Sequence, residues 1–482
     1  MSILFATSEY YPLVKTGGLA DVSSALPGAL LETGQDVTVV LPGYGSVLEK
    51  LGDPIQEYEF QDHLLPDHVC VREYRNPHDD VPLLVVCSDV LFNRGGGPYV
   101  DSSGNDWPDN AQRYAHFCRA VVNLASPSLS PYSKLFDIVH CNDWQTGLVP
   151  AFVTLYGLHT HTVFTIHNLA YQGIYDRFTF DALGLPAEWW QFEALEFYGN
   201  FSFLKAGVVF SNWVTTVSPT YCQEILEEPL ACGMSGLLQH YQHKLVGILN
   251  GVDYQLWDPA TDPHVTFHYD SESIAEKLKN KLDLQRHKGL RLSKSAPLIG
   301  VVSRLVHQKG MDWVLSAMEQ LQKEKIQWVI LGSGDGYLES RLRQLAEANP
   351  KTMSVTIGYD EALAHQIEAS ADLFAMPSRY EPCGLNQIYS LRYGTLPIVR
   401  ATGGLIDTVV DVNDASVEQE TATGFVFEEE SSDAFLETVR RAAAFYSKRK
   451  TWNKIQIRAM AQNFDWSSSA RSYLELYEQK AS

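Results

Sequence analysis

The chain has 482 residues, of which 45% are hydrophobic and 20% are charged, and this composition is typical of a globular protein with about two or three domains. Its 37 basic and 58 acidic residues give a net charge of −21, which excludes a nucleic-acid-binding protein that relies on a broad basic face. The seven cysteines are scattered and form no C-x-x-C pair, which argues against a disulfide framework or a structural zinc site. We therefore expect a cytoplasmic protein without a signal peptide, a membrane-spanning segment or a nucleic-acid partner.

Short apolar runs alternate with amphipathic segments along most of the chain. The runs predict strands at 3–7, 36–41, 83–87, 136–140, 162–167, 214–218, 245–249, 298–303, 327–332, 354–357, 373–376, 396–399 and 425–427. Amphipathic patterns predict helices that include 18–32, 144–156, 273–290, 311–323, 433–446 and 465–479. Because several runs are apolar throughout, they suit parallel strands covered on both faces, and the alternation predicts a doubly wound α/β fold.

The strand–helix pattern runs twice along the chain. After the turn residues at 250–253 the chain enters a polar stretch, and the pattern resumes with the strand at 298. We therefore predict an N-terminal Rossmann-like domain at 1–249 and a second one at 250–456. A C-terminal helix within 457–482 is expected to pack back on the first domain.

The first candidate site is the turn after the first predicted strand, where Lys15 is followed by the pair Gly17 and Gly18. Paired glycines at the start of a helix let backbone N–H groups face an anion, and Lys15 adds a full positive charge beside them. A plain turn between a strand and a helix, where Gly-Gly is common, explains the local pattern equally well.

A second candidate follows the strand at 298–303, where Arg304 and Lys309 precede a helix. Open α/β sheets bind ligands at the carboxyl ends of their strands. There an arginine offers a planar fork for two phosphate oxygens, and a lysine offers a movable point charge. The alternative is a pair of solvated surface charges.

A third candidate is Glu381, which follows the strand at 373–376. Pro382 keeps Glu381 out of the helical region, and Gly384 permits a tight turn into the next helix. An ordinary exposed loop glutamate is the alternative. Further on, Gly403 and its neighbour repeat the Gly-Gly turn and predict a second anion-binding turn.

Polar residues also end two strands of the N-terminal half. His167 is the last residue of the strand at 162–167, although a lone histidine is more often structural than catalytic. Asp143 and Trp144 follow the strand at 136–140, and an acid beside an aromatic ring suits sugar recognition by hydrogen bonds and stacking.

Taken together, these segments resemble those of bacterial glycogen synthases and the related plant starch synthases, which are retaining glucosyltransferases of the GT-B fold that use ADP-glucose. The resemblance covers essentially the whole chain and is carried by residues 15–21, 140–144, 165–173, 250–253, 257–259, 303–309, 358–359 and 381–385. It implies two doubly wound Rossmann-like domains that face each other across a deep cleft. It also implies transfer of glucose from ADP-glucose to the 4-OH at the non-reducing end of an α-1,4-glucan, with retention of configuration and release of ADP.

The resemblance further implies roles for particular residues. Four would act in catalysis: Glu381, His167, Arg304 and Lys309. Eight would bind the donor, with Tyr359 stacked on the adenine: Lys15, Gly18, Asp21, Asn250, Tyr359, Cys383, Gly384 and Leu385. Three would place the glucan acceptor: Tyr99, Asp143 and Trp144. Neither a metal ion nor a cofactor is implied.

One position departs from a pattern that many GT-B transferases share. They carry a second glutamate eight positions after the first, whereas this chain has Tyr389 there, so its contacts with the nucleotide ribose must differ. Two other classes stay open. One is an inverting or sucrose-type transferase of the same fold, and the other is a non-catalytic glucan-binding protein, for which loss of Lys15, Arg304 and Glu381 would be expected.

Overall fold

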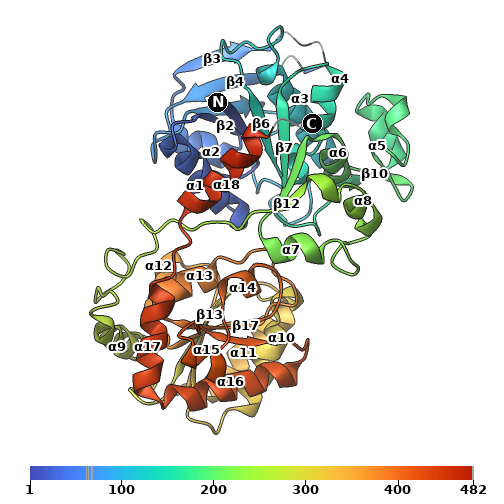
Figure 1. Ribbon diagram of the computed structural model, residues 1–482. Coiled ribbons are helices and arrows are strands. Elements are labelled where there is room, and N and C mark those ends of the chain that lie inside the picture. Colours follow the sequence, from blue (N-terminus) through green and yellow to red (C-terminus); the bar gives the residue numbers. More distant parts are fainter. Residues whose placement is uncertain (61, 63, 67–68, 480–482) are drawn as a thin grey trace. The chain divides into compact units, whose positions relative to one another are not determined.

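A computed structural model describes residues 1–60, 62, 64–66 and 69–479, which form two compact units (Figure 1). Unit 1 comprises Met1–Gly251 and the residues from Trp466 onward, and unit 2 comprises Val252–Asp465. The chain thus leaves unit 1 after Gly251 and returns to it at Trp466. The sequence patterns predicted these two boundaries after residues 249 and 456.

Unit 1 is built on a nine-stranded sheet with the strand order β12-β11-β7-β6-β1-β2-β5-β4-β3. The strands are β1 (Ser2–Ala6), β2 (Asp36–Pro42), β3 (Gln56–Glu59), β4 (Cys70–Tyr74), β5 (Leu83–Cys87), β6 (Ile138–Asn142), β7 (His161–Ile166), β11 (Trp213–Thr216) and β12 (Leu245–Gly247). All are parallel except β3 and β4, which pair antiparallel at one edge. The chain reverses its progress across the sheet between β1 and β6, so polar side chains after these two strands lie at a topological switch point.

Helices cover the sheet of unit 1, and the last of them comes from the C-terminus. They are α1 (Gly18–Glu32), α2 (Gly45–Leu51), α3 (Asn110–Ala125), α4 (Leu148–Leu155), α5 (Arg177–Ala182), α6 (Phe203–Phe210), α7 (Pro219–Glu224), α8 (Ser235–His240) and α18 (Trp466–Glu478), with short 3-10 turns at Trp144–Thr146, Ala187–Trp189 and Gln242–Lys244. In Figure 1 the red helix α18 lies beside α1. The Ser469 hydroxyl donates to the Leu249 carbonyl at 2.6 Å, and the Tyr477 hydroxyl lies 2.7 Å from Nδ1 of His140.

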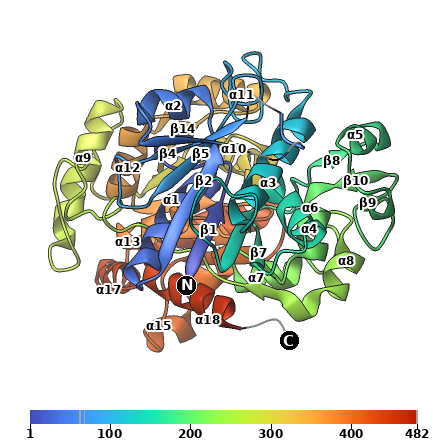
Figure 2. The same ribbon diagram turned by 90° about the horizontal axis from the view of Figure 1, so that it is seen from above.

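A small antiparallel sheet forms a lobe of unit 1 together with α5 (Figure 2). Its strand order is β8-β10-β9, with β8 at Ile174–Tyr175, β10 at Asn200–Ser202 and β9 at Glu196–Phe197. Such short strands carry too few residues for a periodic pattern, so the sequence did not predict them.

Unit 2 is built on a six-stranded parallel sheet with the order β15-β14-β13-β16-β17-β18. The strands are β13 (Leu298–Val302), β14 (Gln327–Gly332), β15 (Met353–Ile357), β16 (Leu373–Met376), β17 (Leu396–Arg400) and β18 (Phe425–Phe427). The helices are α9 (Lys277–His287), α10 (Met311–Gln320), α11 (Gly336–Ala348), α12 (Glu361–Ser370), α13 (Asn386–Arg392), α14 (Gly403–Thr408), α15 (Asp414–Glu418), α16 (Ser432–Tyr446) and α17 (Arg449–Met460), with 3-10 turns at Ile274–Glu276 and His307–Lys309. This order is that of a Rossmann fold, and its switch point lies between β13 and β16.

Alternate residues of the central strands of unit 2 enter two separate cores. On β14, Trp328 and Ile330 pack in the core that includes Met311 of α10, whereas Val329 and Leu331 pack in the core that includes Ile367 of α12. Both faces of the strand are therefore buried, which confirms the prediction from the uninterrupted apolar runs.

Two differences between the predicted and the observed elements have a local cause. The helix predicted at 144–156 is interrupted at Gly147, where a side chain would collide with the Phe203 carbonyl, so a 3-10 turn and α4 replace it. The edge strand β3 has the exposed sequence Gln-Glu-Tyr-Glu, which carries no apolar signal. Across the part of the chain that the structure describes, no helix combines the length and apolarity needed to cross a bilayer.

Candidate active site

A pocket of about 160 Å³ lies at the switch point of unit 2, at the carboxyl ends of β13 and β16. Its lining includes Ser303, Arg304, Lys309, Met376, Ser378 and Asn386. The structure thus brings together the two predicted cations and the segment that precedes Glu381, although about seventy residues separate them in the sequence.

The Glu381 carboxylate is buried at this pocket, and one of its two oxygens is held by two hydrogen bonds. It is 6% exposed, and its Oε2 accepts hydrogen bonds from the Lys309 ammonium at 2.5 Å and the Ser378 hydroxyl at 2.9 Å. An ammonium has three N–H donors, and one of those of Lys309 is directed at Glu381. The pair therefore places a negative and a positive group side by side where a ligand would bind.

Arg379 fastens the Glu381 segment to the segment that carries Lys309. Its guanidinium donates two hydrogen bonds of 2.8 Å to Asp312 and stacks over the ring of Trp313 with 4.1 Å to the ring centroid. Although burial raises the pKa of Asp312, the hydrogen bonds from Arg379 outweigh it and hold the pKa below its usual value. Sequence analysis did not single out Arg379, because a loop arginine carries no signal of such a pairing.

Arg304 lies in the pocket wall with an exposed side chain. Its Nη2 donates to the Gln308 side chain at 3.2 Å. Its guanidinium can turn toward a ligand, because this neutral partner holds it less firmly than a carboxylate would.

The backbone after Glu381 is shaped by close packing. Gly384 has a φ of 72°, and a side chain there would meet the Gln387 side chain. The Gly404 amide donates to the Glu381 carbonyl at 3.2 Å, and a side chain on Gly403 would collide with that same carbonyl. The second Gly-Gly turn therefore allows the close approach of α14, and an anion-binding role for it stays a prediction. Cys383 is buried behind it.

Two tyrosines of unit 2 lie in contrasting surroundings. Tyr359 follows β15 and is 74% exposed, with its hydroxyl donating to Glu361. Tyr389 is 6% exposed and stacks on Trp257, with 3.9 Å between ring centroids and 4° between planes. Tyr389, which stands where many GT-B transferases carry a second glutamate, thus packs in a hydrophobic cluster that also contains Leu385.

In unit 1 the predicted phosphate-binding turn is held by an acid that sequence analysis did not select. The Glu9 carboxylate accepts hydrogen bonds from the amides of Thr16 at 2.6 Å and Gly17 at 3.0 Å. The Lys15 ammonium lies 2.8 Å from the Asp21 carboxylate, so these two predicted donor-binding residues form an ion pair at the start of α1. Gly18 is the first residue of α1, where no side chain caps the helix. The position of Glu9 shortly after the first strand was the sequence feature that could have identified it as a site residue.

His167 and Asp143 meet at the carboxyl ends of β6 and β7. The Asp143 carboxylate accepts the His167 amide at 2.8 Å, and burial raises the pKa of Asp143 to about 7. Asp143 also has a φ of 58° and a ψ of 179°, a conformation that is nearly confined to glycine, and such strain is typical of functional sites.

The protonation state of His167 follows from its neighbour Asn142. The Asn142 amide nitrogen donates to the Ala6 carbonyl at 3.0 Å, so its oxygen faces His167, whose Nε2 lies 2.9 Å away. Nε2 therefore carries the proton, and Nδ1 can accept a hydrogen bond. Burial lowers the pKa of His167 to about 3, so the ring is neutral near pH 7.

The other two predicted acceptor residues are held differently. The Tyr99 hydroxyl donates to Glu9 at 2.7 Å and lies 2.8 Å from the Ser8 hydroxyl. Trp144 is 9% exposed and packs edge-on against Tyr114 and Phe203. Contact of the Trp144 indole with an acceptor stays a prediction, since most of the ring is buried.

Asn250 lies at the end of unit 1 and has a buried acceptor. It is 6% exposed, and among the described residues its Oδ1 has no hydrogen-bond partner. Buried polar atoms without partners are rare, and they recur at functional sites.

Comparisons with known proteins give the family. Residues 2–240 match the family model of the starch synthase catalytic domain, and residues 284–458 match that of glycosyl transferases group 1. Glycogen synthase 2 of Nitrosococcus oceani is 47% identical over 480 residues, which cover 100% of this chain and 97% of the relative. Glycogen synthase of Thioalkalivibrio sulfidiphilus is 48% identical over 480 residues, which cover 99% of each chain.

Solved structures agree with the sequence relatives. The catalytic domain of starch synthase IV from Arabidopsis thaliana, bound to ADP and acarbose, superposes with a TM-score of 0.88 at 31% identity, covering 100% of this chain and 99% of that one. The sucrose-phosphate synthase from Thermosynechococcus elongatus shares the fold, with a TM-score of 0.60 at 17% identity, covering 99% of this chain and 98% of that one. Given these identities over its full length, the chain belongs to the glycogen synthase family of glycosyltransferases and has the GT-B fold.

Proposed function

We propose that the protein transfers glucose from ADP-glucose to the 4-OH at the non-reducing end of an α-1,4-glucan, with retention of the anomeric configuration and release of ADP. The relatives named glycogen synthase support this activity, and so does the ADP-bound starch synthase structure. The structural observation that best supports this activity is the buried carboxylate of Glu381. It is held by Lys309, beside Arg304, at the switch point of unit 2.

The cations act on the leaving group. Cleavage of the bond between the sugar and the diphosphate builds negative charge on the departing oxygen. Arg304 and Lys309 stabilise this charge, because they are placed before the reaction and need little reorganisation. Lys15 and the first-turn amide of Gly18 are assigned to the donor phosphates as well, because Gly18 begins α1 and the N-cap residue, Gly17, has no side chain to cap the helix.

Glu381 acts on the sugar. The anomeric carbon develops positive charge as the bond breaks, and a carboxylate fixed by Lys309 and Ser378 can offset that charge. We do not assign Glu381 as a nucleophile. Instead, the acceptor 4-OH attacks from the face that the diphosphate leaves, and a departing phosphate oxygen takes the proton of that hydroxyl.

His167 acts as a neutral hydrogen-bond acceptor. Its Nδ1 can accept a hydrogen bond from a glucose hydroxyl, while Nε2 is directed at Asn142. Because the pKa of His167 is about 3, the ring is not a general acid near pH 7. Tyr99, Asp143 and Trp144 are assigned to the glucan acceptor.

The proposal includes no metal ion and no organic cofactor. The side-chain cations named above supply the charge that a metal would otherwise supply at a diphosphate. Activity that is unchanged after dialysis against EDTA would support this part of the proposal, and activity restored only by a divalent cation would contradict it. We also propose a cytoplasmic location, which the absence of disulfide bonds among the seven cysteines, all of them in the described part of the chain, supports.

The central experiment measures glucose incorporation into glycogen from ADP-glucose and from UDP-glucose. We expect faster incorporation from ADP-glucose and an α-linked product by NMR. An Arg304→Ala variant should lose about 10²–10³-fold in kcat, whereas Arg343→Ala on the exposed face of α11 should keep wild-type activity. A β-linked product would favour the inverting class, and glycogen binding without incorporation would favour a non-catalytic glucan-binding protein.

A further inference from the structure

Unit 2 has a second and larger pocket at the opposite ends of its central strands. Its volume is about 400 Å³, and its walls include Lys281 of α9, Lys294, Asp372 and Arg449 of α17. Asp372 directly precedes β16, and its backbone amide donates to the Leu298 carbonyl at the start of β13. The pocket therefore lies at the amino ends of the strands whose carboxyl ends form the candidate active site.

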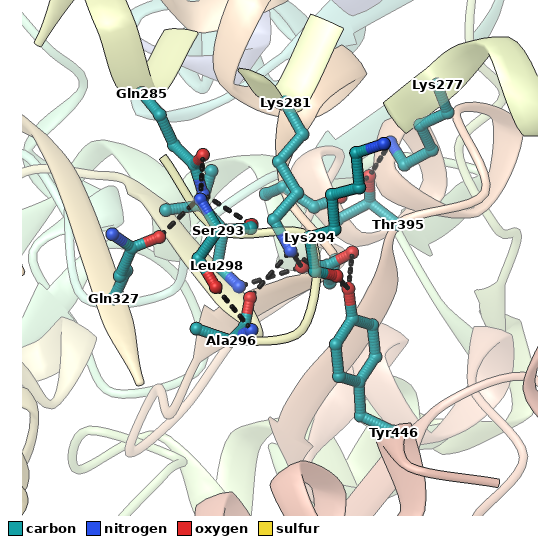
Figure 3. Close-up of polar contacts among 12 residues, drawn as sticks. Lys277, Lys281, Gln285, Ser293, Lys294, Ala296, Leu298, Gln327, Thr395 and Tyr446 are labelled. Carbon is teal, nitrogen blue, oxygen red and sulfur yellow. Dashed lines mark hydrogen bonds and ion pairs between the residues drawn. The ribbon is translucent and has the colours of Figure 1, made fainter. Parts of the chain in front are cut away.

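Two lysines of α9 line this pocket, and Figure 3 shows their polar contacts. Lys281 is buried and donates to the Ala296 carbonyl at 2.6 Å, the Asp372 carboxylate at 2.5 Å and the Tyr446 hydroxyl at 2.9 Å. Lys277 is also buried and donates to the Thr395 hydroxyl at 2.6 Å. These bonds hold both side-chain nitrogens in place. Burial lowers the pKa of both lysines, that of Lys277 to about 7, so Lys277 carries its full positive charge only below neutral pH.

Two further cations stand at the rim. Lys294 and Arg449 are exposed, and among the described residues neither forms an ion pair with a carboxylate. Arg449 donates through Nη2 to the Lys294 carbonyl at 2.9 Å and lies over the ring of Tyr446 with 3.6 Å to the ring centroid. The stacked guanidinium is thus oriented, and its other N–H groups can meet a ligand.

The pocket has an excess of positive charge that comes mainly from the two rim residues Lys294 and Arg449, since Lys281 is paired with Asp372. The lining holds Lys277, Lys281, Lys294 and Arg449 but only one carboxylate, that of Asp372. Asp372 already accepts hydrogen bonds from Lys281, the Tyr446 hydroxyl and the Leu298 amide. In a chain of net charge −21, such an excess of cations in one concave site favours an anionic ligand.

We propose that this pocket binds a small phosphomonoester, with the phosphate between Lys294 and Arg449 and the rest of the molecule in the cavity. An arginine fork and a lysine at one opening suit the oxygens of a phosphate dianion. The volume exceeds that needed for a free phosphate and lies within the range of small-molecule sites, about 300–1,000 Å³. In the wall of α17 the exposed Asn453 amide suits a polar group of the ligand, whereas Trp452 is buried in the core and the Gln456 amide donates to the Gly394 carbonyl.

The proposed site is separate from the candidate active site. Each strand of about five residues spans about 16 Å, so the sheet separates the Arg449 end from the Arg304 end. A phosphomonoester in this pocket should therefore bind independently of ADP at the active site.

Isothermal titration calorimetry on the full chain tests the proposal, with saturating ADP present to occupy the active site. The probes are inorganic phosphate, glucose 1-phosphate, AMP and, as the uncharged control, glucose. We expect binding of at least one phosphorylated probe and none of glucose. Tighter binding of glucose 1-phosphate or of AMP than of inorganic phosphate would identify the sugar phosphate or the nucleotide as the source of the phosphate.

Rim variants locate the binding. Arg449→Gln and Lys294→Ala should each weaken the preferred probe about tenfold, which corresponds to about 1.4 kcal/mol, whereas Lys450→Ala, next to Arg449 but outside the lining, should not. Both rim side chains are exposed, so we expect the variants to fold, and their melting temperatures verify this.

Three results would overturn the proposal: no binding of any phosphorylated probe at millimolar concentration, binding that both rim variants retain, or displacement by ADP. A signal lost in Arg304→Ala but kept in Arg449→Gln would assign the phosphate to the active site and would also count against this pocket. Because the titration measures no turnover, its outcome is independent of whether the proposed glucosyl transfer is correct.

Discussion

Replacement of Glu381 by glutamine separates the chemical role of this carboxylate from its structural role. The carboxylate is 6% exposed and accepts hydrogen bonds from Lys309 at 2.5 Å and from Ser378 at 2.9 Å. The glutamine side chain keeps the size and one carbonyl oxygen, but it removes the negative charge that offsets Lys309. The variant should therefore fold with a weakened contact at this point.

The expected loss of stability follows from that contact. A hydrogen bond to a charged group contributes about 1.5–3 kcal/mol and a neutral one about 0.5–1.5 kcal/mol, so Glu381→Gln should lower the free energy of unfolding by about 1–2 kcal/mol. For a unit of this size the melting temperature should fall by about 2–8 °C. Differential scanning calorimetry measures both.

The expected loss of activity is much larger. If Glu381 offsets positive charge on the sugar, kcat for glucose incorporation should fall about 10²–10³-fold. The affinity for ADP, measured by titration calorimetry, should not fall, since Lys309 remains present and is no longer neutralised. Ser378→Ala is the matched control, because it removes one hydrogen bond from the same carboxylate and leaves its charge, so its kcat should fall far less.

Two results would refute this reasoning. A Glu381→Gln variant that melts earlier but keeps its kcat would show that Glu381 is only the structural partner of Lys309. A covalent glucosyl adduct trapped on Glu381 in the wild-type chain would make the residue a nucleophile and the reaction a double displacement.

Three further predictions concern unit 1. Lys15→Gln removes the charge that lies 2.8 Å from Asp21 and should raise the KM for ADP-glucose by about tenfold or more, while the KM for glycogen stays unchanged in the same assay. Burial raises the pKa of Asp143 to about 7, so the native state holds a proton that the unfolded chain releases above about pH 4. The stability that this proton contributes is lost as the pH rises toward 7. In urea unfolding, the free energy of unfolding of Asp143→Asn relative to that of the wild type should therefore be higher at about pH 8 than at about pH 5. Tyr477→Phe removes the hydroxyl 2.7 Å from His140 and should lower the free energy of unfolding by about 1–3 kcal/mol, measured by thermal unfolding.

Each of these predictions has an opposing outcome. A raised KM for glycogen with an unchanged KM for ADP-glucose would move Lys15 to the acceptor. An equal stability difference at both pH values would mean that Asp143 ionises at its ordinary pKa in the folded chain. Wild-type stability of Tyr477→Phe would show that water replaces the lost hydroxyl beside His140.

The sequence determined the fold class, most of the strands and the family. Uninterrupted apolar runs predicted β5, β14 and β16 with the observed bounds, because a strand buried on both faces needs apolar residues at every position. Several short motifs in one order also carried the resemblance to glycogen synthases, since each motif preserves a turn at the end of a strand. Lys309 and Glu381 were each recognisable by their place after such a strand.

Only the tertiary structure decided how these residues meet. Lys309 and Glu381 lie 72 positions apart and come within 2.5 Å because β13 and β16 are neighbours in the sheet, and the order of strands is not encoded in any local pattern. The same holds for Glu9, whose carboxylate binds the turn at Gly17, and for Tyr389, whose ring stacks on Trp257. Local sequence patterns indicate which face of each segment is buried and which is exposed to solvent. A hydrogen bond between distant segments depends instead on the tertiary packing that brings the two segments together.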